Sequence, residues 1–200
     1  MAMPARRDDQ TPSTSRSLVA AWRLLYPDPE TNRPGDSGAR AALRRAGSPE
    51  AVMLEPAFHA LLLRMKTDGF VFAGFADSRY RRLAMIAGLL AERRDGRSGP
   101  RRFMQELGGS AKAEDRALST LRFQALMAAL DRDLDDHAMT ALRRGMKVAS
   151  DMDFNVEAFA EDLMNWGDAT RIKWTFDYFG RPHLAASPQP AATETEETSR

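Results

Sequence analysis

Residues 154–179 read FNVEAFAEDLMNWGDATRIKWTFDYF, and this stretch decides the fold class. Its apolar residues recur at helical intervals, which predicts two helices, over about 155–166 and 169–179, with a break at Gly167. The large apolar residues of the second helix form two stripes, Ile172, Phe176 and Phe179 on one and Trp174 and Tyr178 on the other. A helix that is apolar on more than one side is buried or docked. Core packing explains these residues, and an exposed anchor for a partner subunit is the alternative.

The same helical spacing continues toward the N-terminus. One helix is expected to start at Asp135 or Asp136 and to end near residue 149. Toward the N-terminus, further helices are expected over 114–130, 102–107, 78–93, 56–66, a short stretch from Ser48–Pro49, 38–46 and 17–26. Ser78 is the expected N-cap of the helix over 78–93, and Asp36 or Ser37 that of the helix over 38–46. No segment of four or more residues alternates apolar and polar positions with β-branched enrichment. The sequence therefore predicts an all-α protein of about eight helices.

We expect these helices to form two small packed bundles between disordered ends. The polar, proline-containing segment 1–14 and the tail 181–200 have little to bury, which is typical of disorder. Between them we expect an N-terminal helical bundle with a basic face over 15–109 and a C-terminal helical bundle over 110–180.

The composition excludes several classes of protein. Hydrophobic residues make up 43% of the 200 residues, which is enough for a core, but no run of eighteen apolar residues predicts a membrane span. No apolar stretch follows Arg6 and Arg7, so a secretory signal is not expected. The absence of cysteine excludes disulfides and thiolate chemistry. We expect a cytoplasmic protein.

Catalytic and metal-binding motifs are missing from the sequence. The three histidines, His59, His137 and His183, form no paired or HExxH arrangement, and no P-loop or G-x-S-x-G frame occurs. Two acidic runs, one over 131–136 and one over 151–162, lack the glycine of a calcium loop at the sixth position. We expect no catalytic residue, metal or cofactor. An enzyme, the least favoured alternative, would need Asp131, Asp133 and Asp136 to converge on a metal.

The near-neutral net charge of +1 hides an asymmetry along the chain. Residues 33–102 carry 14 Arg/Lys against 7 Asp/Glu, whereas residues 103–200 carry 11 against 17. A basic block indicates an anionic partner. Of the 29 cations 25 are arginine, which suits bidentate phosphate binding. The base composition of a GC-rich genome explains the same ratio.

Two arginine clusters lie on predicted helices. In GARAALRRA, residues 38–46, Arg40 and Arg44 share a face and Arg45 lies about 100° further round. In ALRRGMK, residues 141–147, three cations flank the apolar stripe and are expected to point away from the core: Arg143, Arg144 and Lys147. Arg122 and Arg116, on the preceding predicted helix, could extend this row of cations. A solvated face with scattered ion pairs is the alternative.

The order of these features resembles the CasB family, the small subunit of the type I-E CRISPR interference complex, Cascade. The first element of the resemblance is Trp22 followed by G-x-R-A-x-L-R-R, with Gly38, Arg40, Ala41, Leu43, Arg44 and Arg45. The second is the closing helical pair, with Leu163, Trp166, Trp174 and Tyr178, and Arg122–Phe123 resembles a further feature. The resemblance extends over roughly residues 17–180.

The resemblance implies a fold of two small helical bundles and a subunit without catalytic activity. It implies as partners the other Cascade subunits, a second copy of the chain placed head to tail, crRNA and target DNA, with no membrane and no small-molecule substrate. Its role would be to hold the displaced non-target strand of the R-loop. By motif position it places Arg40, Arg44, Arg45, Arg143 and Arg144 on nucleic acid. Together with the clusters above, the expected nucleic-acid-binding residues are Arg40, Arg44, Arg45, Arg122, Arg143, Arg144 and Lys147.

A free-standing helical DNA-binding regulator is the alternative function. It would need a recognition helix whose side chains reach base edges. Phosphate contacts alone carry no sequence information, and no aromatic ladder interleaves with the arginines. We therefore expect the backbone of a nucleic acid, rather than its sequence, to be bound.

Overall fold

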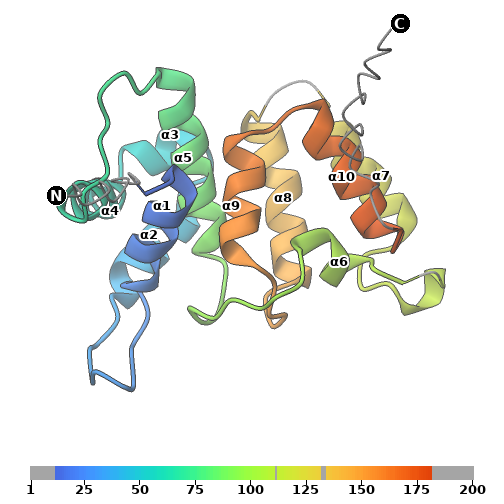
Figure 1. Ribbon diagram of the computed structural model, residues 1–200, viewed down its shortest axis with the longest axis horizontal. Helices are drawn as coiled ribbons and strands as arrows, with labels where there is room; N and C mark the ends of the chain where they lie inside the picture. The colour runs from blue at the N-terminus through green and yellow to red at the C-terminus, as the bar shows by residue number, and fades with distance from the viewer. Residues whose placement is uncertain (1–11, 111, 132–133, 182–200) are drawn as a thin grey trace, which may run out of the picture.

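A computed structural model describes residues 12–110, 112–131 and 134–181 of the chain (Figure 1). These residues form ten α-helices, rather than the expected eight or so, and one 3-10 turn, and they contain no strand beyond two isolated bridges. The all-α prediction is confirmed. The elements are α1 Thr14–Arg23, α2 Ser37–Arg45, α3 Pro49–Met53, α4 Pro56–Thr67, α5 Asp77–Leu90, α6 Phe103–Leu107, η1 Ala113–Asp115, α7 Thr120–Ala129, α8 Asp136–Val148, α9 Val156–Met164 and α10 Asp168–Tyr178. The segments predicted to be disordered lie outside the described residues, except 12–14 and 181.

Side-chain caps define where most of these helices begin. The side chain of the N-cap residue accepts a hydrogen bond from a backbone N–H of the first turn in α1, α2, α3, α7, α8 and α9, through Ser13, Asp36, Ser48, Ser119, Asp135 and Asn155. Ser78, expected to cap α5, lies inside that helix, whose N-cap is Ala76. Asp77 in the first turn places a negative charge at the positive end of the helix dipole instead.

The helix predicted over 114–130 begins only at Thr120, because tertiary contacts hold the preceding residues in another conformation. The backbone N–H of Leu118 donates to the carbonyl of Leu107 (2.8 Å), and the Leu118 carbonyl accepts from the hydroxyl of Tyr178 (2.7 Å). The guanidinium of Arg116 lies over the rings of Tyr178 and Phe179, at 5.2 and 5.0 Å. These partners come from distant parts of the chain, so local periodicity could not reveal them.

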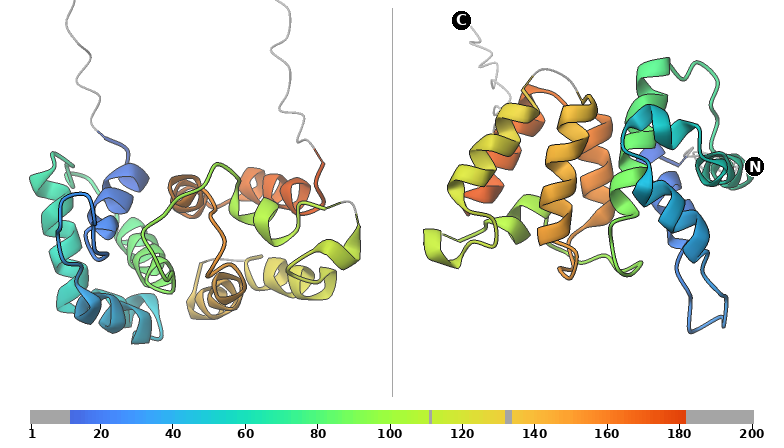
Figure 2. Two further views of the ribbon diagram at one scale, coloured as in Figure 1. Left: turned by 90° about the horizontal axis from the view of Figure 1, so that it is seen from below. Right: turned by 180° about the vertical axis from the view of Figure 1, so that it is seen from behind.

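The helices form two layers around α5 (Figure 2). One layer contains α1, α9, α10 and the short α6, and the other contains α2, α8 and α7. All residues of α5 from Leu83 to Leu90 are buried, and the helix contacts α1, α2, α3, α8 and α9. Gly88 allows this close packing, because a Cβ there would lie 2.7 Å from the Met139 methyl on α8 and 3.0 Å from Val52 on α3.

The two halves of the chain pack together over a broad contact. Helix α9 contacts both α1 and α5, and α6 contacts α10. The division into bundles at residues 109 and 110 stays a prediction. In the closing helix Trp174 and Tyr178 are buried, whereas Ile172 and Phe176 remain 49% and 38% exposed. Core packing thus accounts for one of the two stripes of α10.

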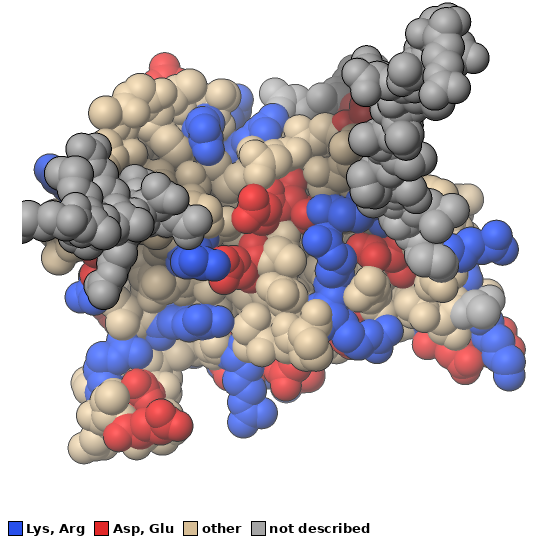
Figure 3. All heavy atoms as spheres, in the orientation of Figure 1, with Lys and Arg blue, Asp and Glu red and all other residues tan. Residues whose placement is uncertain are grey.

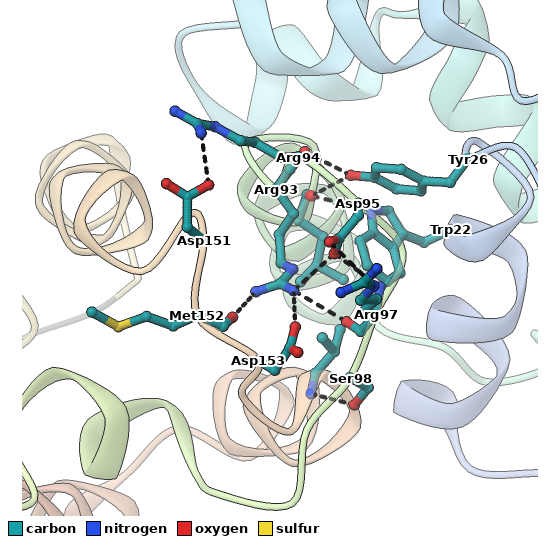
Figure 4. Close-up of polar contacts among 12 residues, drawn as sticks. Trp22, Tyr26, Arg93, Arg94, Asp95, Arg97, Ser98, Asp151, Met152 and Asp153 are labelled. Atoms are coloured by element: carbon teal, nitrogen blue, oxygen red, sulfur yellow. Dashed lines mark hydrogen bonds and ion pairs between the residues drawn. The ribbon is translucent and has the colours of Figure 1, made fainter.

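Arg93 joins the end of α5 to the loop that follows α8 (Figure 4). Its side chain is only 1% exposed. Nη1 donates to the carbonyl of Met152 (2.5 Å), Nη2 donates to the carbonyl of Arg97 and to Asp95 (both 3.2 Å), and the guanidinium lies 4.8 Å from the ring of Phe154. A single buried cation therefore connects two loops that come from opposite halves of the chain.

Candidate nucleic-acid interface

Arg44 and Arg45 occupy the last turn of α2 and are both exposed. The helix is anchored by buried Leu43 and by Asp36, whose carboxylate caps its N-terminus. Neither arginine has an ion pair or side-chain hydrogen bond with any described residue. Both guanidinium groups are therefore available to an external anion.

Arg40, on the same helix, is turned toward the protein. Its guanidinium lies 4.8 Å from the ring centroid of Tyr26, and Nη1 donates to the carbonyl of Arg94 (3.3 Å). Burial raises the pKa of the Tyr26 hydroxyl to about 12, although Arg40 opposes this rise. The phenol is therefore neutral at physiological pH, and its hydroxyl donates to the carbonyl of Arg93 (3.0 Å). Half-buried Arg40 supports α2 on this ring, and its predicted contact with nucleic acid remains a prediction.

The prediction that Arg143 points away from the core is wrong. Its Nη2 donates to the carbonyl of Ala46 (2.5 Å), where α2 ends, and its Nε lies 3.5 Å from a carboxylate oxygen of Glu92. The exposed fractions of the Arg143 and Glu92 side chains are only 16% and 10%. Burial lowers the pKa of Arg143, and the nearby Glu92 carboxylate opposes this shift. Arg143 therefore links α8 to the end of α2 and to Glu92, just beyond α5, and its predicted contact with nucleic acid stays a prediction.

Arg144 and Lys147 on α8 and Arg122 on α7 are exposed. In the part of the chain that the structure describes, none of these three side chains has an ion-pair partner. Arg122 and Arg144 both line a groove of about 500 Å³ between the two helices. These three positions fit the prediction of outward-facing cations, and their role in binding stays a prediction.

The fold brings the helices that carry these exposed cations onto one side of the molecule. The bonds from Arg143 to the carbonyls at the end of α2 place that end beside the middle of α8, and α7 packs on the other flank of α8. Helices α2, α8 and α7 thus form one continuous layer (Figure 2). We call the set Arg44, Arg45, Arg122, Arg144 and Lys147 the cation strip. Guanidinium and ammonium groups without carboxylate partners can follow a phosphate backbone without reading its bases.

The opposite face differs, because its cations alternate with carboxylates (Figure 3). Arg102 and Lys173 both contact Asp162, Arg101 lies 3.4 Å from Glu106, and Arg16 lies 3.1 Å from Glu157. Each of these four cations is thus paired with a carboxylate of the protein, although Arg23 on α1 has no ion-pair partner among the described residues. The contrast favours the layer of α2, α8 and α7 as the surface for an anionic partner.

A second basic hollow was not singled out from the sequence. Arg101, Arg102, Lys173 and Arg181 line a hollow of about 490 Å³ together with Asp177. Burial raises the pKa of the Asp177 carboxyl, and a hydrogen bond from Gln105 opposes the rise. The Arg101–Arg102 doublet was the available signal. Because Glu106 and Asp162 pair with three of these cations and Asp177 adds a carboxyl to the lining, the hollow is weaker than the cation strip as a phosphate site.

The acidic residues considered for an enzyme do not gather in the described part of the structure. No group of three or more histidine, aspartate or glutamate side chains there could hold a metal ion. Asp131 pairs instead with Arg171 (2.5 Å), and Asp133 lies outside the described residues. No helix in the described ranges is long and apolar enough to cross a membrane.

Comparison with known proteins identifies relatives of this chain. The profile of the family described as CRISPR-associated protein Cse2 matches residues 39–179. Curated proteins give no significant match. Among solved structures, the chain is similar to a chain in the crystal structure of E. coli Cascade bound to a PAM-containing dsDNA target, with a TM-score of 0.56 and 21% identity over 82% of this chain and 94% of that chain. That likeness concerns the fold, whereas the family match spans α2 to α10. The chain therefore belongs to the family of CRISPR-associated protein Cse2.

Proposed function

We propose that this chain is the non-catalytic small subunit of a type I-E CRISPR interference complex, Cascade, and that its cation strip holds the displaced strand of target DNA. One observation carries the proposal: in a chain of this family, the exposed cations of α2, α7 and α8 lack ion-pair partners among the described residues, and these three helices lie in one layer. The partners proposed are the other Cascade subunits, a second copy of the chain, crRNA and target DNA. The solved relative comes from such a complex bound to dsDNA.

The physical mechanism is a shift in a nearly balanced equilibrium. Replacing a DNA duplex with an RNA–DNA hybrid changes the free energy little. A surface that binds the released strand stabilises the open state, and each phosphate contact adds to the effect. Since every target has a different sequence, the contacts must be to the backbone, which arginine and lysine side chains can provide.

Reversing two charges of the strip tests this role. We expect Arg44→Glu with Arg45→Glu to shorten the R-loop lifetime at least about tenfold at physiological salt, because repulsion replaces two phosphate contacts. The lifetime is measured with reconstituted complex on labelled duplex target, after circular dichroism has shown that the variant folds. The matched control is Arg23→Glu with Lys66→Glu, two exposed cations on α1 and α4 with no ion-pair partner among the described residues. An unchanged lifetime in the α2 variant would contradict the proposal.

Two adjacent arginines on α8 should behave in opposite ways. We expect Arg143→Met to lower the free energy of unfolding by about 2 kcal/mol, because the Ala46 carbonyl and Glu92 lose their buried partner. Its affinity for single-stranded DNA should stay within about twofold. Arg144→Met should leave the free energy of unfolding within about 0.5 kcal/mol and weaken DNA binding. Urea denaturation and fluorescence anisotropy measure the two quantities, and loss of affinity in Arg143→Met alone would reverse the assignment.

A further inference from the structure

The groove between α7 and α8 combines an apolar floor with a cationic rim. Its volume is about 500 Å³, within the usual range of small-molecule sites of about 300–1,000 Å³. The floor residues are mostly small or aliphatic: Leu118, Ala125, Leu126, Ala129, Ala141, Gly145 and Val148. None of the lining residues is acidic, and Arg122, His137 and Arg144 are the basic ones. The lining of the groove thus suits a ligand that has an apolar surface and also carries negative charge.

The spacing of the two helices sets the two arginines against each other. Residues 122, 125, 126 and 129 line the groove from α7, residues 137, 140, 141, 144, 145 and 148 line it from α8, and Leu118 lines it from the segment before α7. The steps of three and four residues between 122, 125 and 129 recur in reverse order between 137, 141 and 144. Two helices joined by a short connection pack antiparallel, so this register places Arg122 opposite Arg144 across the groove. Neither has an ion-pair partner among the described residues.

A nucleotide with an unpaired base matches this arrangement. A base has a planar apolar face that can lie on the small side chains of the floor, and burying that face is favourable. The phosphates on either side of the nucleotide would then meet Arg122 and Arg144. In duplex DNA the base face is stacked, whereas in a displaced single strand it is free. Apolar contact with a base does not depend on the sequence of the strand, because every base has such a face.

We propose that the α7–α8 groove takes an unpaired base of single-stranded nucleic acid, with Arg122 and Arg144 binding the flanking phosphates. This inference rests on the proposed function and deepens it, since it makes the groove a site for single strands rather than for duplexes. Contact with a base adds to affinity without selecting a sequence. An apolar helix of a partner subunit would cover the same floor, but it would leave the two arginines unneutralised unless it carried acidic residues in register.

The test compares two DNA strands that carry the same phosphates. One is oligothymidylate of about twelve nucleotides, a length that spans a typical single-strand site. The other has abasic sugars at its central positions. We expect the full chain to bind the first strand roughly tenfold more tightly by fluorescence anisotropy, equivalent to about 1.4 kcal/mol.

A groove-filling variant locates the effect. Ala125→Leu with Ala141→Leu should abolish the difference between the two strands and leave the affinity for the abasic strand unchanged. Leucine is a good helix former, so both helices are expected to persist. The control is Ala128→Leu, an exposed position of α7 that does not line the groove, and it should retain the full difference. If the double variant fails to fold, Ala125→Leu alone takes its place, and equal affinity of the unaltered chain for the two strands would still overturn the base site.

The outcomes separate this inference from the proposed function. Equal affinity for both strands, with binding still weakened by Arg44→Glu and Arg45→Glu, would overturn the base site and leave the proposed function standing. Equal affinity together with loss of complex assembly in the filled variant would identify the groove as a surface for a partner subunit and would also overturn the base site. If the chain binds neither strand, and if Arg44→Glu with Arg45→Glu leaves the R-loop lifetime unchanged, both the base site and the proposed function are overturned.

Discussion

Replacing Arg93 with methionine is expected to lower the free energy of unfolding by about 3 kcal/mol. Its guanidinium is almost completely buried and donates to the carbonyls of Met152 and Arg97, which methionine cannot replace as a donor. Methionine has a similar length and apolar character, so the loss reflects the missing hydrogen bonds and charge more than a cavity. The loops that join the two halves of the chain would lose their common anchor. Urea denaturation followed by tryptophan fluorescence measures the change.

Arg94 provides a matched control one residue away. Its side chain is 73% exposed and forms a surface ion pair with Asp151 at 2.8 Å. Exposed pairs of this kind stabilise proteins by about 1 kcal/mol or less, so Arg94→Met should change the free energy of unfolding by no more than that. Equal effects at the two positions would show that Arg93 does not act as the anchor of the junction.

The salt dependence of single-strand binding is expected to change most when four arginines of the strip are removed together. For single strands the slope of log affinity against log salt is about −0.7 for each phosphate neutralised. Arg44, Arg45, Arg122 and Arg144, all replaced by alanine, should therefore reduce the steepness of the slope by roughly 3. If the four arginines no longer contribute to binding near 1 M salt, the affinity of the variant at 0.1 M salt is expected to be roughly several hundred-fold below that of the unaltered chain. Anisotropy titrations over a series of salt concentrations measure both quantities.

The control for this variant removes cations that lie elsewhere. Arg23→Ala with Lys66→Ala changes exposed residues of α1 and α4 and should leave the slope nearly unchanged. A variant of the strip that lost affinity without any change in slope would argue for a folding defect or an apolar contact. A slope that fell equally in the control would show that net charge, rather than the layer of α2, α8 and α7, governs binding.

Local sequence patterns predicted where the helices lie. The apolar stripes depend on residues three and four apart, and caps such as Asp36, Ser48 and Asp135 act on the next turn of their own helix. These interactions operate within a few residues, so the all-α fold and the break at Gly167 follow from the sequence. The placement of Arg44, Arg45 and Arg144 on helices, beside stripes that are buried, also follows from the sequence.

The roles of neighbouring arginines could not be predicted in the same way. Arg143 and Arg144 flank the same stripe and differ only in which neighbour approaches them. Arg143 lies beside Glu92 and donates to a carbonyl at the end of α2, whereas Arg144 lines the groove between α7 and α8. For Arg93 a signal existed, since it lies three residues beyond Leu90 on the buried stripe of α5, but its partners come from the loop after α8.

The sequence by itself determined most of the helices and their caps, the absence of strand patterns and the clustering of arginines along the chain. Only the tertiary structure decided which of those arginines is buried and links helices and which faces outward. The tertiary structure alone also brings α2, α8 and α7 into one layer. The physical reason is the range of the interactions. Helix periodicity and capping act between residues a few positions apart, whereas the burial of a guanidinium depends on carbonyls and carboxylates that are distant in sequence and meet it only after folding.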